Sequence, residues 1–243
     1  MRSLKITGVG ILLLIISFKS FSQNEKINIG FGYNVGTHIK TDGIDFVIDR
    51  YNNTRPDLIK QMNKPKYFHG FNYSIELIRE KFLIDCEWVG RKSSLYSEIE
   101  NPIIGITTRD IKFKVNSIHL GIGYKIGRDK KQKGFYAGSD LVFATSKQLT
   151  SVQKSFWIIG VTQEGSAKIK SDINIGISPF IYFVGKHFSN KLYLQLLFLD
   201  QSYQNLNRTI NPNSWALDNP SSSKGKIHSI GISTRFLLFK VKD

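Results

Sequence analysis

Charged side chains recur at every second position along several stretches of this chain, where they alternate with apolar side chains. The charged candidates are Glu76, Asp85, Glu87, Lys125, Asp140, Lys170 and Arg235. Two neighbouring carboxylates can serve as general acid and base, and opposite charges in a narrow interior must pair to offset their desolvation. Since neighbouring polar residues on one strand face occur in any polar interior, we favour a network of ion pairs. A proton or ion path is the alternative.

The histidines show no pattern of a metal site or a nucleophile. The five are His38, His69, His119, His187 and His228, and none has a spacing such as HExxH. His38 and His69 border the same long connection and could meet, as a lipid-modifying enzyme would require. Serine and aspartate are too common here to make that signal specific. We therefore predict no catalytic residues, no cofactor and no metal.

The alternation of apolar and polar residues predicts β-strands with two unlike faces. Eight such stretches cover about 26–36, 71–78, 82–88, 118–126, 135–145, 169–183, 192–198 and 230–238. Short links alternate with long ones at 37–66, 92–110, 146–166 and 201–225, as expected for strands that run between two unlike environments. We predict an all-β fold, an eight-stranded antiparallel transmembrane up-and-down β-barrel. Ten strands remain open if the second and third long links add a pair.

One strand carries a change of phase. Ile111, Phe113 and Val115 alternate in the opposite phase to Ile118 and the apolar residues that follow it. A β-bulge at about 116–117 would reconcile the two halves.

Aromatic residues decide which face meets lipid. On the apolar face, Phe82, Tyr124, Phe135, Phe183 and Phe236 lie toward one end of the strands, and Tyr33, Phe71, Trp88, Phe143 and Phe198 lie toward the other. Two such girdles about 20 Å apart match the apolar band of an outer-membrane barrel. A soluble barrel is the alternative, but eight strands enclose too little space for these large faces. Tyr136, Phe180 and Tyr182 narrow the predicted lumen further.

The first 22 residues predict a secretory signal peptide, which leaves 23–243 as one outer-membrane barrel domain. Arg2 and Lys5 precede an apolar run that is shorter than a membrane span, and Ser20 and Ser22 suit the cleavage site. Cys86 is the only cysteine. The formal net charge is +15, but the basic residues are scattered and form no basic helix. We therefore expect contact with anionic lipid headgroups and no nucleic acid.

Two of the long links contain apolar side chains that could bind a partner. In 37–66, Phe46 and Tyr51 belong to a predicted short helix, and a second helix would begin with Thr54 as its cap and run to about Met62. This connection could be a lid packed on the barrel mouth or a surface for a protein partner. Phe156 and Trp157 make the third long link apolar, and we favour an extension of the strand hairpin there over a docking site.

The signal segment, the eight amphipathic strands and the aromatic-rich final stretch 235–239 resemble the small outer-membrane β-barrel superfamily, of the OmpA-type or porin-family kind. The glutamine after the cleavage site and the Ile/Lys/Asn-rich style resemble members from Bacteroidota. The resemblance implies a multi-pass protein of the bacterial outer membrane that the barrel-assembly machinery inserts. It implies no single activity. Our first hypothesis is a non-enzymatic protein that anchors or presents extracellular binding loops and has a plugged lumen. A narrow pore or transporter and a lipid-modifying barrel enzyme are the alternatives.

Overall fold

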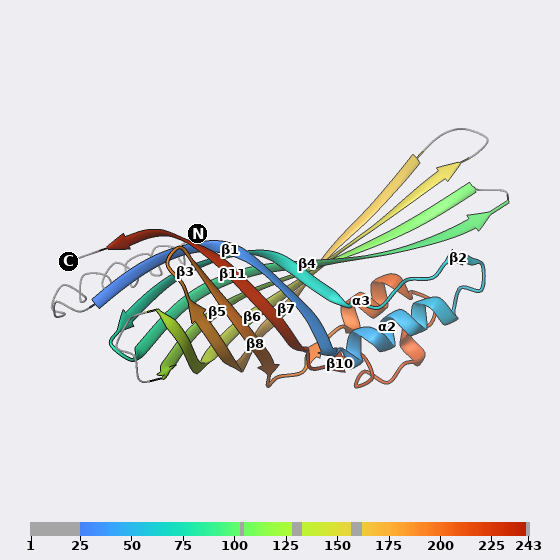
Figure 1. Cartoon of the computed structure of the whole chain (residues 1–243). Coiled ribbons are helices and arrows are strands. Elements are labelled where there is room, and N and C mark those ends of the chain that lie inside the picture. Colours follow the sequence, from blue (N-terminus) through green and yellow to red (C-terminus); the bar gives the residue numbers. More distant parts are fainter. Residues whose placement is uncertain (1–24, 103–104, 128–132, 157–161, 242–243) are drawn as a thin grey trace, which may run out of the picture.

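The structure is a computed structural model that describes residues 25–102, 105–127, 133–156 and 162–241. Eight antiparallel strands close into a ring in the order β1, β3, β4, β5, β6, β7, β8 and β11, and β11 pairs with β1 (Figure 1). Their bounds are β1 Glu25–Lys40, β3 Tyr67–Arg79, β4 Phe82–Asn101, β5 Gly105–Ile126, β6 Gly134–Phe156, β7 Thr162–Val184, β8 Phe188–Leu197 and β11 His228–Val241. The predicted eight-stranded barrel is confirmed. The predicted signal peptide lies outside the described residues.

Strand alternation puts apolar side chains on the outside of the ring and polar side chains on the inside. Phe71 is 56% exposed and Phe135 is 53% exposed, whereas their neighbours Asn72 and Tyr136 are fully buried. The residues of both predicted girdles lie on this outer face. Among the described residues, no helix is long and apolar enough to span a membrane.

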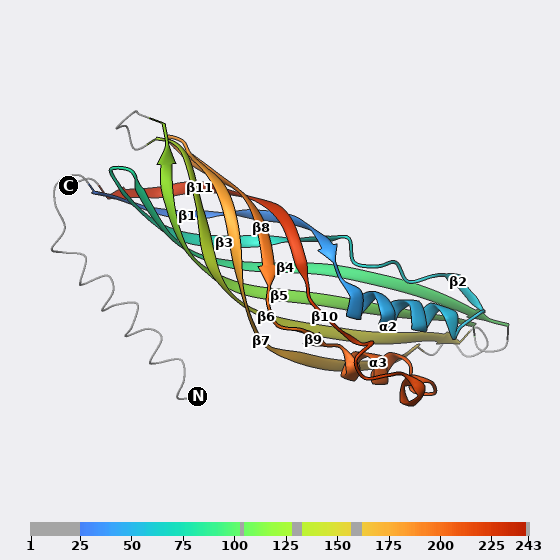
Figure 2. The same cartoon turned by 90° about the horizontal axis from the view of Figure 1, so that it is seen from below.

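We call the girdle of Tyr33, Phe71, Trp88, Phe143 and Phe198 the outer girdle. Four neighbouring strands continue far beyond it as two long hairpins, β4–β5 and β6–β7 (Figures 1 and 2). We call the part of these strands beyond the girdle, residues 91–101, 105–115, 146–156 and 162–171, the flange. The second and third long links of the sequence are therefore hairpin extensions of existing strands. The side chain of Phe156 and the whole of Trp157 lie outside the described structure.

The predicted bulge at 116–117 is wrong, because β5 pairs without a register shift with both β4 and β6. The phase changes because the surroundings of the strand change. Ile118 faces outward toward the apolar band, while Val115 and Phe113 face inward, where apolar side chains cover them. The same inward face thus changes from polar in the barrel to apolar in the flange.

A bulge does occur in β7, where Thr145 pairs with Ile173 but Lys147 pairs with Lys170. One residue of β6, Ser146, therefore opposes two of β7, Ser171 and Asp172, and the extra residue reverses the facing of the chain beyond it. Ile169 turns inward and Lys170 turns outward, where it is exposed.

Two connections fold into a compact unit against the inner side of the flange. The first holds helix α2 (Asp42–Asn53) and strand β2 (Leu58–Lys60), and the last holds β9 (Gln201–Ser202), helix α3 (Gln204–Ile210), the 3-10 helix η2 (Trp215–Leu217) and β10 (Lys224–Gly225). We call this unit the head. It closes an apolar core in which α2 contributes Ile44, Val47, Ile48 and Tyr51, and β5 contributes Ile111 and Phe113.

Helix α2 forms because its apolar residues follow the helical spacing and because Asp42 and Asp45 suit the positive N-terminal end. The predicted first helix is confirmed, but the predicted second helix is wrong. Thr54 is the C-cap of α2, with its hydroxyl donating to the carbonyl of Arg50 at 2.9 Å. Pro56 follows the end of the helix, where proline is common because it cannot continue one. The chain then pairs with β4 as β2.

Candidate functional site

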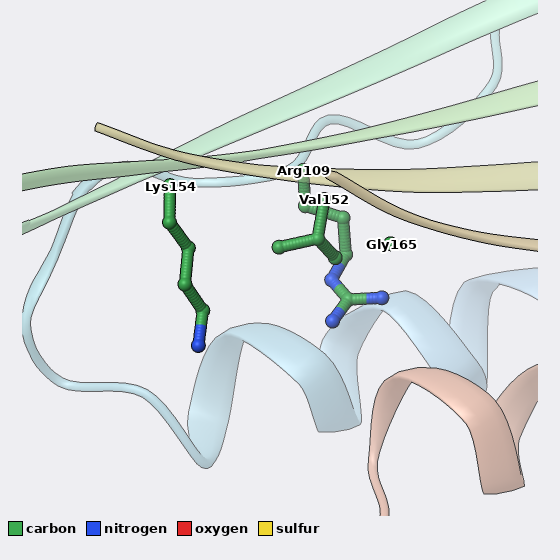
Figure 3. Close-up of a pocket in the computed structure, with 4 residues that line it drawn as sticks. All are labelled: Arg109, Val152, Lys154 and Gly165. Atoms are coloured by element: carbon green, nitrogen blue, oxygen red, sulfur yellow. The ribbon is translucent and has the colours of Figure 1, made fainter. Parts of the chain in front are cut away.

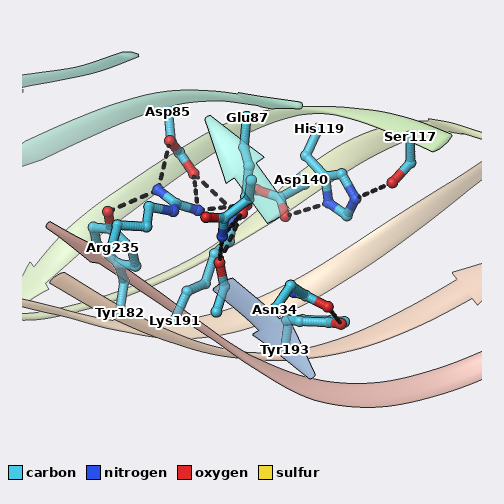
Figure 4. A network of polar contacts seen from close by, with 12 residues as sticks. Asn34, Asp85, Glu87, Ser117, His119, Asp140, Tyr182, Lys191, Tyr193 and Arg235 are labelled. Carbon is cyan, nitrogen blue, oxygen red and sulfur yellow. Dashed lines mark hydrogen bonds and ion pairs between the residues drawn. The ribbon is translucent and has the colours of Figure 1, made fainter. Parts of the chain in front are cut away.

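A polar network crosses the lumen, and six of its charged residues come from five strands. They are Glu76 on β3, Asp85 and Glu87 on β4, Asp140 on β6, Lys191 on β8 and Arg235 on β11. All of them except Glu76 are labelled in Figure 4. Each is at most 2% exposed. They share the inward face because each occupies the polar phase of its strand, and the ring closure brings β11 next to β1, with only β1 and β3 between it and β4.

Arg235 reaches three carboxylates. Its Nη1 and Nη2 lie 3.1 and 3.3 Å from the two oxygens of Asp85. The same group forms an ion pair with Glu87 and lies 3.4 Å from Glu76. The planar guanidinium suits this task because its donors form a fixed fork that matches a carboxylate.

Lys191 is the second cation of the network and contacts three carboxylates. Its Nζ lies 2.8 Å from Asp85, 2.8 Å from Asp140 and 3.4 Å from Glu87. An ammonium has three donors, and here each points to a different carboxylate. Because an unpaired charge in this interior would be very costly, Lys191 and Arg235 stabilise the four carboxylates as one unit.

Neutral side chains satisfy the remaining carboxylate oxygens. Glu76 accepts hydrogen bonds from the hydroxyls of Tyr182 and Ser189 and, at 3.2 Å, from Asn28 Nδ2. Glu87 accepts from Asn72 Nδ2 at 2.9 Å and from Ser233 Oγ at 2.8 Å. These hydrogen bonds restrict the geometry of the two carboxylates.

Three members of the network have the order found in acyl-transfer enzymes. Ser117 Oγ lies 2.9 Å from His119 Nε2, and His119 Nδ1 lies 3.2 Å from Asp140 Oδ2. Ser117 is only 1% exposed, however, and on β5 it is followed toward the flange by Val115 of the head's apolar core. Asp140 is also held by Lys191. The three side chains therefore have triad-like contacts without an opening for a substrate.

Apolar side chains lie on both sides of the network. On the flange side lies the apolar core of the head, and at the other end a second cluster contains Ile78, Leu83, Tyr136 and Val184. Tyr136, Phe180 and Tyr182 are at most 5% exposed, so the predicted narrowing of the lumen by these three rings fits their positions.

The structure places the sequence-predicted charged residues as follows. Glu76, Asp85, Glu87, Asp140 and Arg235 meet in the network, and Lys125 is also buried on the inward face. Lys170 does not belong to the lumen, because the β7 bulge turns it outward.

Sequence reasoning missed Lys191, the second cation of the network. It lies two residues before Tyr193 on the same face of β8. If the predicted seventh strand began at Lys191 instead of Leu192, its polar face would include this lysine.

His38 and His69 do not form a shared site. On neighbouring strands they point to opposite sides, since His69 follows the outward phase of β3 with a hydrogen bond to Tyr33, and His38 packs inward against Phe68 with ring centroids 4.1 Å apart. Burial and the nearby charge of Arg91 lower the pKa of His38 to about 4. Among the described residues no cluster of His, Cys, Asp and Glu could hold a metal ion.

A pocket of about 290 Å³ opens between the flange and the head. It is lined by Arg109, Val152, Lys154 and Gly165, and the two cationic side chains point from the strands toward α2 (Figure 3). The guanidinium of Arg109 lies 5.7 Å from the ring centroid of Tyr51, and that of Arg55 lies 4.0 Å from it. Burial and the charge of Arg109 lower the pKa of Arg55, although the Tyr51 hydroxyl opposes this shift.

Phe46 and Tyr51, predicted as partner contacts, pack within the head. Tyr51 is 2% exposed and its hydroxyl accepts a hydrogen bond from Ser97 Oγ at 3.0 Å, and Phe46 is half-buried against the apolar core. The expectation that Tyr51 contacts a partner does not fit this burial.

The outer surface of the ring decides the environment of the protein. Between the two girdles, exposed side chains such as Ile84, Leu120, Ile122 and Ile181 are apolar, while the charged groups are enclosed. Such a surface is stable in a lipid bilayer and unfavourable in water. The chain has the architecture of a small outer-membrane β-barrel, and it is a multi-pass outer-membrane protein.

Comparisons with known proteins add little to this. No protein-family model and no curated protein matches the chain. Among solved structures, Ail, the attachment invasion locus protein of Yersinia pestis, is 12% identical with a TM-score of 0.42, over 88% of this chain and 98% of Ail. The structure of Ail in complex with the heparin analogue sucrose octasulfate is 10% identical with a TM-score of 0.35, again over 88% of this chain and 98% of Ail. The N-terminal β-barrel domain of Pseudomonas aeruginosa OprF is 10% identical with a TM-score of 0.25, over 88% of this chain and 97% of that domain. With TM-scores this low, none of these likenesses bears on function.

Proposed function

We propose that this protein is a non-enzymatic outer-membrane barrel that anchors an extracellular binding head and whose lumen is plugged. The observation that carries the proposal is the construction of the head. Its two connections are joined by Arg55, whose Nη2 donates to the carbonyl of Ile210 at 2.6 Å, and by Arg50, whose Nε lies 3.2 Å from Asp218. A head that shares a buried apolar core with the flange is a rigid platform, and rigid scaffolds commonly position binding surfaces.

The pocket beside α2 is the proposed binding site of the head. Two of its four lining residues are cationic, and Arg55 adds a third positive charge nearby. Val152 and the ring of Tyr51 supply apolar surface. This combination favours an anionic ligand with an apolar portion, presented either by a small molecule or by a protein partner.

The lumen supports an anchoring role better than a transport role. Four carboxylates share two buried cations, Lys191 and Arg235, and apolar clusters lie on both sides of them. Free passage of ions or solutes would require these charges to separate within a narrow interior. The other partners that we propose are outer-membrane lipids, including those with anionic headgroups, and the barrel-assembly machinery. We expect no nucleic acid.

Site-specific photo-crosslinking on intact cells tests the binding role. A benzophenone amino acid replaces Lys154 in the pocket, and the matched control replaces Lys186 in the short β7–β8 turn at the opposite end. A discrete adduct at position 154 that disappears in Arg109→Gln, with folding unchanged, is the expected result. Equal adducts at both positions, or none at position 154, would count against the binding head.

An acyl-transfer enzyme is the second candidate, because Ser117, His119 and Asp140 have triad-like contacts. The burial of Ser117 and the ion pair between Asp140 and Lys191 oppose it. The lipid profile of cells that carry Ser117→Ala separates the two functions. A lost acyl or lipid species would favour the enzyme, and an unchanged profile is expected for the binding protein.

A further inference from the structure

Four lysines face one another across the outer side of the flange. Lys92 on β4 pairs with Lys114 on β5, Lys114 pairs with Lys147 on β6, and Lys147 pairs with Lys170 on β7. We call these four residues the lysine ladder. Directly opposed residues have Cβ atoms about 5 Å apart, so four ammonium groups lie in one row about 14 Å long across neighbouring strands. Lys112 and Lys168 extend the row on the next level, on either side of Leu149.

This arrangement is unfavourable for the protein alone. Like charges placed directly opposite one another destabilise a sheet. Partial desolvation and the charges of Lys168, Lys114 and Lys170 lower the pKa of Lys147. In the part of the chain that the structure describes, no carboxylate forms an ion pair with a ladder lysine. The row therefore concentrates positive charge that a bound anion would neutralise.

The height of the ladder above the outer girdle indicates which kind of anion it meets. Lys92 lies four residues beyond Trp88, and Lys147 lies four residues beyond Phe143, on the same outward faces. Trp88 and Phe143 belong to the outer girdle. Four residues on a tilted strand rise by about 10 Å, which is the level of the headgroups above the hydrocarbon. The long lysine side chains can also bend toward the membrane.

The surface around the ladder also suits a lipid. The helices of the head lie on the other side of these strands, so the ladder face is open. Below the ladder on β4, Trp88 extends along the strand over Gly90, where an added Cβ would lie 2.6 Å from the indole. The apolar surface for an acyl chain is therefore continuous with the cationic row for its headgroup.

We propose that the lysine ladder is a binding site for the phosphate groups of lipids in the outer leaflet, with Trp88 contacting the acyl chains of the bound lipid. This site is separate from the pocket of the head and does not depend on what the head binds. Binding of anionic lipids is thereby assigned to four lysines that pair in one register.

Quenching of Trp88 fluorescence by lipids with brominated acyl chains tests this site. The full-length mature chain, with Trp157→Phe and Trp215→Phe to leave one tryptophan, is reconstituted in phosphatidylcholine vesicles. Brominated phosphatidic acid and brominated phosphatidylcholine are then compared at equal mole fractions. We expect phosphatidic acid to associate with the Trp88 site at least about fivefold more strongly, the contribution of one lysine near an anionic surface. The preference should weaken at high salt.

Two variants with the same loss of charge make the test specific. The ladder variant carries Lys→Gln at Lys92, Lys114, Lys147 and Lys170, and the control carries Lys→Gln at the exposed head residues Lys60, Lys66, Lys224 and Lys226. A heat-modifiable gel shift establishes that each is folded, and the double substitution Lys114→Gln with Lys147→Gln serves if the ladder variant does not fold. The preference should vanish in the ladder variant and persist in the control.

Three results would overturn the proposal. They are no headgroup preference in the parent protein, a preference that the ladder variant retains, and an equal loss in the control. A fourth result would assign the ladder to a soluble anion instead of a lipid. If the ladder binds a soluble sulfated polysaccharide in detergent but shows no preference among lipids, its ligand is a soluble polyanion and the lipid site is wrong.

Discussion

Arg235 and Asp85 are joined by two hydrogen bonds across the lumen, from the last strand of the ring to the third. The same aspartate also accepts from Lys191 at 2.8 Å. The strands that carry these three residues are brought together only when β11 closes on β1. The central ion pairs therefore form with ring closure, and they link the stability of the barrel to its closed state.

Removal of Arg235 should destabilise the barrel strongly. Arg235→Met leaves Asp85 and Glu87 dependent on Lys191 alone, and loss of one partner of a buried ion pair costs about 3–5 kcal/mol. Unfolding in urea from lipid vesicles measures the loss. Lys226→Met, at an exposed lysine of the head, is the control and should change the free energy of unfolding by less than about 0.5 kcal/mol.

A double substitution distinguishes charge pairing from packing. The variant that combines Asp85→Asn with Arg235→Met should lose less stability than the sum of the two single variants. Each single variant leaves the charge of the other residue without this partner, whereas the double variant removes both charges. Strict additivity would show that the two residues do not act as a pair.

The lumen should not conduct ions. In planar bilayers the purified protein should show no stable openings, because the paired charges lie between two apolar clusters. Steady openings of porin size would contradict the plug and favour the pore hypothesis. In that case Arg235→Gln should change the ion selectivity, since Arg235 is fully buried in the lumen.

The alternation of apolar and polar residues predicts the facing of a strand correctly only where the surroundings of both faces stay the same along the strand. Within the membrane, alternation placed Glu76 inside and Phe71 outside correctly, since lipid and lumen impose opposite preferences on the two faces. In the flange the same pattern has another cause. Ile111 and Phe113 face inward because the head covers them, and a single sequence does not reveal that cover. The phase change alone therefore predicts a bulge that the structure does not contain.

Long-range contacts explain the other differences. The bulge that turns Lys170 outward is visible only in the pairing of β6 with β7. The position of Tyr51 inside the head depends on Arg109 of the flange and Arg55 beyond α2. The lysine ladder likewise becomes visible only from the register of four strands.

The stability of the protein should fall in acid partly because of His38. Burial and the charge of Arg91 lower its pKa to about 4 in the folded protein, against 6.5 for an unperturbed histidine. Between these values the unfolded chain binds more protons, so the free energy of unfolding falls as the pH decreases from 6.5 to about 4. His38→Gln should reduce this slope in thermal melts in detergent. His187→Gln, at an exposed turn histidine, is the control. An unchanged slope in His38→Gln would contradict the assignment.

The head should unfold without the barrel when Tyr51 is truncated. Tyr51 lies in the apolar core, accepts a hydrogen bond from Ser97 and packs against the guanidinium of Arg55. Tyr51→Ala removes a buried ring, a change that costs about 3–5 kcal/mol in well-packed cores. The eight-stranded ring makes its own hydrogen bonds and central ion pairs, so it should remain closed. Limited proteolysis should then cut the connections 41–66 and 198–227, while the heat-modifiable gel shift persists. Asn53→Ala, at the exposed end of α2, should leave both connections resistant. If Tyr51→Ala abolishes the gel shift as well, the head and the barrel fold as one unit, and the head is not an independent platform.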